Sequence, residues 1–321
     1  MEQLVATLNA IGESTRLRIL ALCGRAELTV SELQQVLSQS QPRISRHLRI
    51  LSEAGLLNRR REGAWTYYRL RHSGEQAEIA REIIVRLPGD DPVVKGDLDR
   101  LGQVKETRRL AAEQYFRANA ARWDEIRALH ADVALIERRL LELVPAGTGA
   151  RLVDIGTGTG RILQIFAPRI GYGLGIDLSH EMLTVARVNL DDPAFANCEV
   201  QQGDMYRLPC RDAKFDIAIV NMVLHYAEHP GEVIEEAARV LRPGGRLVVV
   251  DFAPHENVAL REEHAHRWAG FSDATIAGYF ASAGMEPPDG EAIAEGRLTV
   301  SIWSAERAAS VTALAHTGAT G

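Results

Sequence analysis

The part of this sequence that points most directly to chemistry is a segment of alternating glycines that begins at Asp154 and is followed by a second acid, Asp177. Residues 154–160 have the sequence Asp-Ile-Gly-Thr-Gly-Thr-Gly and follow a short apolar run. Glycine permits the tight turn of such a loop and lets a ligand approach the backbone closely. Asp177 follows Gly160 by 17 residues, at the end of a second apolar run, where a carboxylate can accept hydrogen bonds from both hydroxyls of a ribose. The pattern predicts a site for a nucleoside-containing cofactor, and the glycines alone leave dinucleotides open as an alternative.

The elements that would position these residues follow from the rhythm of the chain after Arg151. Short apolar runs alternate with helical patterns there, which predicts βαβ units and an α/β doubly wound sheet. A third strand should end in Gly203-Asp204-Met205, a fourth should cover residues 215–221, and a fifth should end the stretch 241–251. The carboxyl ends of such strands would bring the acidic residues to one edge of the sheet.

The ordered set of DIGTGTG at 154–160, GID at 175–177, GDM at 203–205 and LRPGGRL at 241–247 resembles the class I S-adenosylmethionine-dependent methyltransferases, which have a Rossmann-like fold. The resemblance covers about residues 150–252, and segments 127–140 and 260–272 are similar to those of the UbiE-like group of small-molecule methyltransferases. A dinucleotide site is disfavoured because the sequence lacks a third glycine at GxGxxG spacing.

The resemblance also implies a role for each matching residue. The glycines would admit the methionyl part of S-adenosylmethionine or S-adenosylhomocysteine, Asp154 would orient its ammonium group, and Asp177 would bind the ribose. The methionines and Asp204 would surround the adenine, and Asn221 would lie near the sulfonium. Tyr115 would cover the cofactor or, equally, belong to a packing stripe between domains. The implied cofactor-binding residues are Tyr115, Asp154, Gly156, Gly158, Gly160, Asp177, Met182, Asp204, Met205 and Asn221.

Catalytic residues are not fixed by these motifs. The methyl group of a sulfonium is already activated, so a transferase mainly has to align the acceptor and exclude water. The side chains that could remove a proton from an acceptor are His225, Tyr226, His264 and His266. His264 and His266 are two positions apart and would point in different directions on a helix, so they are poorly placed to share a metal ion.

The N-terminal ninety residues differ in charge from the rest of the chain. The whole sequence has a net charge of −6, yet residues 40–71 contain eight arginines and only two glutamates. A basic segment in an acidic protein indicates a polyanionic partner for that segment, or a solvated arginine-rich face.

Two short helices and a hairpin in this region predict a DNA-binding domain of the winged helix-turn-helix type, an α+β fold. Helical patterns cover residues 31–37 and 40–53, and Ile44, Leu48 and Leu51 would be the buried stripe of the second helix. β-forming residues on both sides of Glu62-Gly63 predict an arginine-rich wing. Such a helix can enter the major groove and such a wing can lie on phosphates. The candidate DNA-contacting residues are Ser40, Gln41, Arg43, Ser45, Arg46, His47, Arg49, Arg59, Arg60 and Arg61.

Residues 4–71, above all the segment SRHLRILSEAGLL, resemble the ArsR/SmtB winged-helix repressors. That resemblance implies a homodimer that recognises an inverted-repeat operator in double-stranded DNA, with repression relieved by a ligand. Many relatives sense metals through cysteines at the start of the third helix, but residues 27–31 contain none. No metal site is therefore predicted.

Domain boundaries follow from breaks in these patterns. We expect a DNA-binding domain over 1–87, a linker and connecting helices over 88–145, a methyltransferase domain over 146–304 and a disordered tail over 305–321. A membrane span is not expected, because no apolar run reaches about 18 residues. A secretory signal is not expected either, because residues 1–20 contain acids and arginines and no continuous apolar stretch. The three cysteines are too far apart for a disulfide framework, so a cytoplasmic protein is predicted.

Two functions remain open on these grounds. The first is a transcriptional regulator whose methyltransferase-fold domain binds S-adenosylmethionine or S-adenosylhomocysteine and modulates DNA binding. The second is an active small-molecule methyltransferase whose DNA-binding domain controls its own expression. Both need the same cofactor pocket, so the cofactor motifs do not separate them.

Overall fold

The structure is a computed structural model, which describes residues 1–62, 65–129, 133–144, 147, 149–255, 267–294 and 298–308, with the backbone alone over 115–129. Contacts divide the chain into two compact units. The first unit consists of residues 1–119 and 180–197, and the second unit is the rest of the chain. None of the helices that the structure describes has the length and apolar content needed to span a lipid bilayer.

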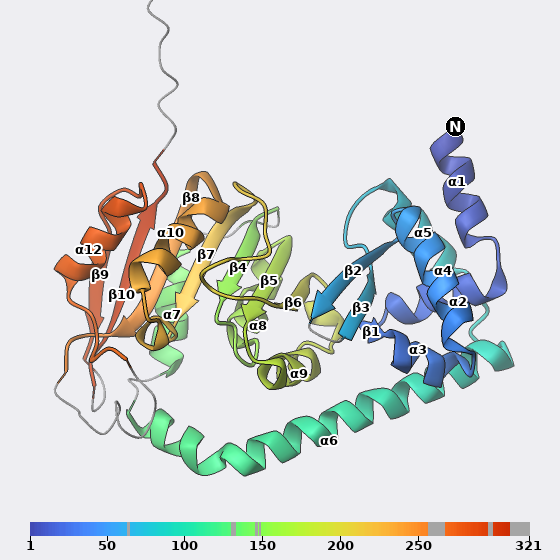
Figure 1. The fold of residues 1–321 in the computed structure, drawn as a ribbon, viewed down its shortest axis with the longest axis horizontal. Helices are drawn as coiled ribbons and strands as arrows, with labels where there is room; N and C mark the ends of the chain where they lie inside the picture. Colours follow the sequence, from blue (N-terminus) through green and yellow to red (C-terminus); the bar gives the residue numbers. More distant parts are fainter. Residues whose placement is uncertain are drawn as a thin grey trace, which may run out of the picture. The chain divides into compact units, whose positions relative to one another are not determined.

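The first unit contains a winged helix-turn-helix (Figure 1). Its three-stranded antiparallel sheet has the order β1-β3-β2, and the wing is the hairpin in which Leu57 pairs with Leu70 and Glu62 pairs with Trp65. The elements of this unit are α1 (Glu2–Ile11), α2 (Ser14–Cys23), β1 (Leu28–Thr29), α3 (Val30–Leu37), α4 (Gln41–Glu53), β2 (Leu57–Glu62), β3 (Trp65–Leu70), α5 (Glu75–Val85), the first part of α6 (Pro92–Leu129), α9 (His180–Asn189) and a 3-10 helix, η2 (Pro193–Phe195).

Local sequence explains where the two helices of the motif begin. Helix α3 starts with a capping box, because the Thr29 hydroxyl accepts from the Glu32 N–H at 3.3 Å and the Glu32 carboxylate accepts from the Thr29 N–H at 2.7 Å. The predicted stripe of α4 is confirmed, since Ile44, Leu48 and Leu51 are completely buried.

The first connecting helix begins within the range 88–145 expected for the linker and connecting helices. Helix α6 starts at Pro92. The side chain of Asp91 accepts hydrogen bonds from the Val93 and Val94 N–H groups at 2.8 and 3.1 Å. Proline suits the first helical position because its missing N–H needs no partner there.

The second unit is built on a seven-stranded sheet with the order β6-β5-β4-β7-β8-β10-β9 (Figure 1). The first five strands are parallel, and β10 is antiparallel to both of its neighbours. Its strands are β4 (Arg151–Ile155), β5 (Tyr172–Asp177), β6 (Cys198–Gln202), β7 (Phe215–Asn221), β8 (Leu241–Phe252), β9 (Asp289–Ile293) and β10 (Val300–Glu306).

Helices complete the second unit, in keeping with the strands β4 and β5 being buried almost throughout their length. They are the end of α6, α7 (Val133–Leu143), α8 (Arg161–Phe166), η1 (Ala167–Arg169), η3 (Leu224–Tyr226), α10 (Pro230–Val240) and α12 (Asp273–Ser282). The boundary predicted for the C-terminal tail was wrong, because Ala305 and Glu306 pair with β8 as part of β10. Residues 309–321 of that tail lie outside the described residues.

Candidate functional site

The polar residues singled out in the second unit lie at the carboxyl ends of four neighbouring parallel strands. Asp154 is the penultimate residue of β4, Asp177 ends β5, Asp204 follows β6 and Asn221 ends β7. Strand ends of a parallel sheet share one edge, which is where ligands bind in doubly wound folds. The structure therefore brings these predicted residues together at one edge of one sheet.

Asp154 is buried and keeps one carboxylate oxygen open. Its Oδ2 accepts a hydrogen bond of 2.6 Å from the Thr157 hydroxyl, whereas its buried Oδ1 has no partner among the described residues. Burial raises the pKa of Asp154 to about 7; the charge of Asp177 adds to the rise, and the Thr157 hydrogen bond opposes it. A buried acceptor without a donor is costly, so this oxygen fits the ammonium group of a bound cofactor.

Asp177 is held in place by the backbone on both sides. Its Oδ2 accepts from the Gly158 N–H at 2.8 Å and its Oδ1 accepts from the Ser179 N–H at 2.9 Å. Burial raises the pKa of Asp177, against these backbone hydrogen bonds. A carboxylate has about four acceptor positions, so this side chain can still receive two ribose hydroxyls.

The glycines of the loop serve different purposes. A Cβ atom on Gly156 would lie 2.6 Å from the side chain of Val223, so this position is glycine because the chain after β7 packs on it. Gly158 has a φ of +52° and open space where a Cβ atom would be, which suits close approach of a ligand to the backbone. Gly160 precedes the first residue of α8.

Asn221 adds a second acceptor to this edge, because its buried Oδ1 has no partner among the described residues. Asp204 is exposed and accepts a hydrogen bond of 3.0 Å from the Tyr206 N–H, while Met205 is half-buried against the core. The open acceptors and the space above Gly158 fit the predicted S-adenosylmethionine, whose ammonium and hydroxyl groups are donors.

Two predicted cofactor residues belong to the first unit. Met182 is a half-buried residue of α9. Tyr115 lies on α6, and its side chain falls outside the described residues. The cofactor contacts predicted for Met182 and Tyr115 therefore stay predictions.

The structure describes two of the four candidate catalytic residues, His225 and Tyr226. His225 is buried, and its Nδ1 lies 2.9 Å from Asp251 Oδ1, an acid that sequence reasoning missed. Asp251 also accepts hydrogen bonds from the backbone N–H groups of His225 and Phe252. Tyr226 is half-buried, with its ring centroid 4.1 Å from that of His225. His264 and His266 lie outside the described residues.

The predicted DNA-binding surface of the first unit is formed by α3, a turn and α4. Ser38 makes the turn, with a left-handed φ of 53°. Six of the seven candidate residues at the start of α4 are exposed, namely Ser40, Gln41, Arg43, Ser45, Arg46 and Arg49. His47 differs, because it is half-buried and its Nδ1 lies 3.6 Å from Glu13 Oε2, and a DNA contact for it stays a prediction. Burial lowers the pKa of His47, against the charge of Glu13.

The wing arginines do not share one face. Arg59 and Arg61 are exposed, as predicted, whereas Arg60 points to the other side of β2 and pairs with Glu27 at 3.4 Å. Successive residues of a strand face opposite sides, so a run of three arginines cannot present all of its side chains to one phosphate backbone. The prediction of a DNA contact for Arg60 is corrected on this ground.

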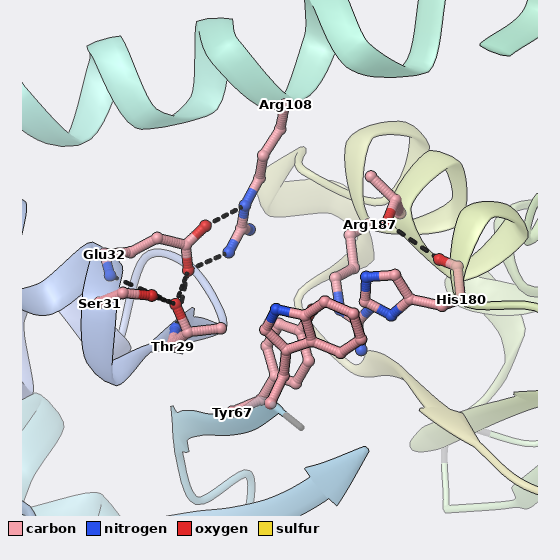
Figure 2. A pocket seen from close by; sticks show the side chains of 9 residues that line it. Thr29, Ser31, Glu32, Tyr67, Arg108, His180 and Arg187 are labelled. Carbon is pink, nitrogen blue, oxygen red and sulfur yellow. Dashed lines mark hydrogen bonds and ion pairs between the residues drawn. The ribbon is translucent and has the colours of Figure 1, made fainter. Parts of the chain in front are cut away.

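A pocket of about 230 Å³ lies beside the turn end of the wing hairpin in the first unit (Figure 2). Its walls include Thr29 and Ser31 at the start of α3, Trp65 and Tyr67 on β3, and Arg187 on α9. Nothing in the sequence pattern predicted this pocket, because its walls come from segments far apart in the chain.

Comparison with known proteins agrees with both parts of this geometry. Residues 153–249 match the family described as a methyltransferase domain, and residues 11–60 match a helix-turn-helix domain family. This chain joins an ArsR-type helix-turn-helix domain to a class I methyltransferase domain.

Relatives of the methyltransferase domain are diverse in their names. A ubiquinone/menaquinone biosynthesis C-methyltransferase UbiE of Roseobacter denitrificans is 33% identical over 133 residues, which are 40% of this chain and 53% of that protein. An arsenite methyltransferase of Aquipseudomonas alcaligenes is 32% identical over 137 residues, which are 40% of this chain and 38% of that protein. This chain thus spans about half, or less, of the length of these relatives.

A solved structure supports the fold. A chain from the complex that contains the Trm112 methyltransferase activator of Haloferax volcanii is 26% identical to this chain, with a TM-score of 0.51 over 60% of this chain and 96% of that chain.

Proposed function

We propose that this protein is a DNA-binding transcriptional repressor whose methyltransferase domain binds S-adenosylmethionine or S-adenosylhomocysteine, and that the bound ligand modulates affinity for an inverted-repeat operator. S-adenosylmethionine supplies an activated methyl group on a sulfonium, and its product lacks both the methyl group and the charge. The two ligands should therefore affect DNA binding differently.

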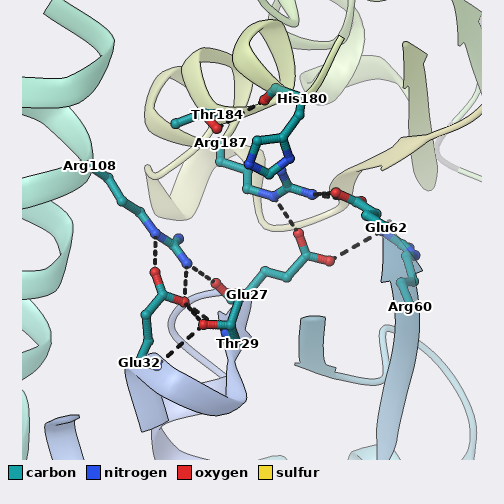
Figure 3. A network of polar contacts seen from close by, with 9 residues as sticks. All are labelled: Glu27, Thr29, Glu32, Arg60, Glu62, Arg108, His180, Thr184 and Arg187. Carbon is teal, nitrogen blue, oxygen red and sulfur yellow. Dashed lines mark hydrogen bonds and ion pairs between the residues drawn. The ribbon is translucent and has the colours of Figure 1, made fainter. Parts of the chain in front are cut away.

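The observation that carries this proposal is a set of buried ion pairs joining helix α9 to the turn end of the wing hairpin (Figure 3). Arg187 on α9 donates through Nη2 to both oxygens of Glu62 at 2.7 Å and through Nε to Glu27 Oε2 at 2.9 Å. The three side chains are at most 8% exposed. Glu62 ends β2, the strand that carries Arg59 and Arg61.

The energetics of these ion pairs oppose small displacements of α9. Burial alone would raise the pKa of Glu27, but the charges of Arg187 and Arg60 outweigh it and lower that pKa. The Arg187 guanidinium also lies 3.9 Å from the centroid of the Tyr67 ring. Separating such groups would leave uncompensated charge in the interior, so the wing and α9 should move together.

The chain leads directly from the proposed ribose site to this helix. Only Leu178 and Ser179 separate Asp177 from the first residue of α9, and the Ser179 N–H donates to Asp177. A ligand that binds Asp177 therefore acts on the segment that enters α9. Such a ligand shifts DNA affinity by its differential affinity for two conformations, typically about 5–150-fold.

Exposed apolar residues on α1 support the proposed homodimer. Leu4, Val5 and Leu8 expose 40–47% of their surface, and they lie within one helical turn of each other. A two-fold interface on α1 would cover this patch. Ultracentrifugation of Leu8→Glu should then show a lower apparent mass than the unaltered protein.

Calorimetry tests the proposed regulation. An operator would first be selected from random DNA, and both ligands would then be titrated with and without it. Reciprocity requires the operator to change ligand affinity by the factor by which the ligand changes operator affinity. Asp177→Ala should abolish the response and keep the affinity of the unliganded protein for DNA, whereas Asp289→Ala, on the exposed edge strand β9, should change neither. Ligand affinities that are the same with and without operator would contradict the proposal.

The second candidate function is an active small-molecule methyltransferase, favoured by the buried His225–Asp251 pair that follows Asn221. An aspartate on Nδ1 fixes the tautomer and orientation of an imidazole, as general-base catalysis requires. Radiolabelled S-adenosylmethionine incubated with a metabolite extract tests this alternative. Label transfer that Asp251→Asn abolishes would favour the enzyme, and the absence of transfer would favour the regulator.

A further inference from the structure

An open pocket of about 600 Å³ lies along one flank of α4, the second helix of the helix-turn-helix. Its walls include Arg16 of α2 together with Ser40, Arg43, Arg46, His47 and Ile50 at and along α4. Arg43, His47 and Ile50 are spaced by four and three positions, so they share one face of the helix. Gln41 and Ser45, two other candidate DNA contacts, are not part of these walls.

The charge of this pocket is unbalanced. Arg43 and Arg46 are exposed and form no ion pair with any residue that the structure describes. Glu13 is the nearby acid, but its Oε2 accepts from the Arg16 backbone N–H at 2.9 Å and lies 3.6 Å from His47 Nδ1. Three guanidinium groups thus share a wall with a single carboxylate beside them, and an accessible cluster of this kind attracts an anion.

Arg16 is held in place before any ligand arrives. Its Nε donates to the carbonyl of Ala10 and its Nη2 donates to that of Asn9 at 3.0 Å, at the end of α1. Its Nη1 donates to none of the described residues and keeps accessible surface. A guanidinium that is fixed on one side loses little freedom when its other side binds an acceptor. The Ser40 hydroxyl makes no capping hydrogen bond with α4, so it is a further donor for the pocket.

We propose that this pocket holds one phosphate of the DNA backbone, which is contacted by Arg43 of α4 and by Arg16, a residue that precedes the helix-turn-helix. Guanidinium groups suit phosphates because their N–H groups form a planar fork. Base edges line the floor of the major groove, whereas phosphates border it, so a basic cluster on the flank of α4 suits a phosphate. The inference rests on the DNA binding proposed above and adds Arg16 to the residues that hold DNA.

Fluorescence anisotropy with a labelled operator, selected from random DNA, tests the pocket in the full-length protein. Arg43→Gln and Arg16→Gln should each weaken binding to operator and to random DNA by the same factor, about three- to eightfold at about 0.1 M salt, where eightfold is the loss of one phosphate contact. Because both side chains hold one phosphate, the double variant should also lose no more than about eightfold. Arg86→Gln, at an arginine that is 72% exposed outside the pocket, is the matched control and should bind like the unaltered protein.

Three results would overturn the proposal. The first is a larger loss on operator than on random DNA, which would indicate contact with a base. The second is a loss of about sixtyfold in the double variant, the product of two independent phosphate contacts. The third is unaltered binding of both kinds of DNA by Arg43→Gln.

Neutral methylphosphonate linkages, placed one at a time in the operator, locate the phosphate. At one linkage of each half-site the unaltered protein should lose affinity, and the combination of that linkage with Arg43→Gln should cost no more than either change alone. Arg43 is exposed, so this measurement stays decisive if Arg16→Gln, which loses its bonds to α1, fails to fold. Independent effects of Arg43→Gln and of every linkage would overturn the proposal.

Two further outcomes separate this site from its alternatives. Displacement of the operator by millimolar inorganic phosphate at constant ionic strength would show that the pocket takes the free ion, and would overturn its assignment to DNA. Failure of the unaltered protein to bind any DNA would overturn the proposed repressor together with this site, whereas unaltered DNA binding in Arg43→Gln would overturn this site alone.

Discussion

The Thr157 hydroxyl donates a 2.6 Å hydrogen bond to Asp154 Oδ2 and leaves the other carboxylate oxygen without a partner among the described residues. Thr157 occupies the place between two loop glycines, so the loop that admits the cofactor also orients the acid beneath it. An acid with one satisfied and one open oxygen is prepared for a single cationic group. Its protonation state should therefore govern ligand binding.

Cofactor affinity is expected to fall in mild acid. Burial raises the pKa of Asp154 to about 7 in the unliganded protein, and an ammonium group binds the ionised form. Protonation then competes with the ligand below that pKa. We expect S-adenosylhomocysteine to bind about tenfold more weakly at pH 6 than at pH 8, as measured by calorimetry. A pH-independent affinity would contradict the role of Asp154.

The same acid should make folding less favourable as the pH rises. A folded pKa above the unfolded value of 3.8 means that the stability contribution is complete below 3.8 and is lost as the pH rises through about 7. Asp154→Asn keeps an acceptor for Thr157 and cannot ionise. At pH 8 without ligand, this variant should be more stable than the unaltered protein by at most about 4 kcal/mol. Urea titrations at pH 5 and pH 8 check this, with a clearly larger difference expected at pH 8 than at pH 5.

Loss of Arg187 should destabilise the first unit strongly. Arg187→Met removes the arginine that pairs with buried Glu62 and one of the two arginines that pair with buried Glu27, and breaking a buried ion pair typically costs about 3–5 kcal/mol. Arg86→Met removes an exposed ion pair and should cost less than about 1 kcal/mol. Urea unfolding followed by circular dichroism compares the two. Adding Glu27→Gln and Glu62→Gln to Arg187→Met should recover part of the loss, and equal effects of the two arginine variants would refute the buried network.

Acid should weaken the same network. The pKa of Glu27 is lowered in the folded protein because Arg187 and Arg60 outweigh the effect of burial. Its contribution to stability is therefore complete above its ordinary pKa of 4.5 and is lost as the pH falls through the lower folded value. Glu27→Gln should flatten this acid limb in a pH series of unfolding curves. An unchanged limb would show that other acids control it.

Measurements of DNA binding should distinguish the role of the recognition helix α4 from the role of the wing. Arg46→Ala or Gln41→Ala should weaken specific binding by about 1–3 kcal/mol if each side chain contacts a base edge. Arg59→Ala should weaken binding to all sequences and reduce the salt dependence by about one unit of slope. Mobility shifts on operator and random DNA at several salt concentrations would show this, and unchanged specific binding in Arg46→Ala would reject the helix assignment.

Local patterns in the sequence predicted most of the structural features that depend on residues close together in the chain. The strand-end acids Asp154 and Asp177 were found because a strand, a glycine turn and a helix are contiguous in the chain. The stripe of α4 was found because its period is that of a helix. Strands β9 and β10 were missed, since β10 pairs with β8, whose residues are about fifty positions away, and β9 pairs in turn with β10.

The partners of individual side chains could not be predicted in the same way. Arg60 was expected on the DNA-binding face because it stands between two exposed arginines, but its carboxylate partner is 33 residues away. Arg187 meets Glu62 from 125 residues away. Periodicity identifies which face of an element is buried, whereas the identity of the residue opposite depends on the complete tertiary fold.

The first unit is discontinuous in sequence, and this has a consequence for the order in which the protein is made. The ribosome releases residues 1–119 before residues 120–179, and only then the segment 180–197 that completes the unit. Glu27 and Glu62 therefore have to remain hydrated or protonated while the nascent chain lacks Arg187. A truncated product that ends near residue 119 would never acquire Arg187. It would therefore be the form most easily captured by chaperones and proteases.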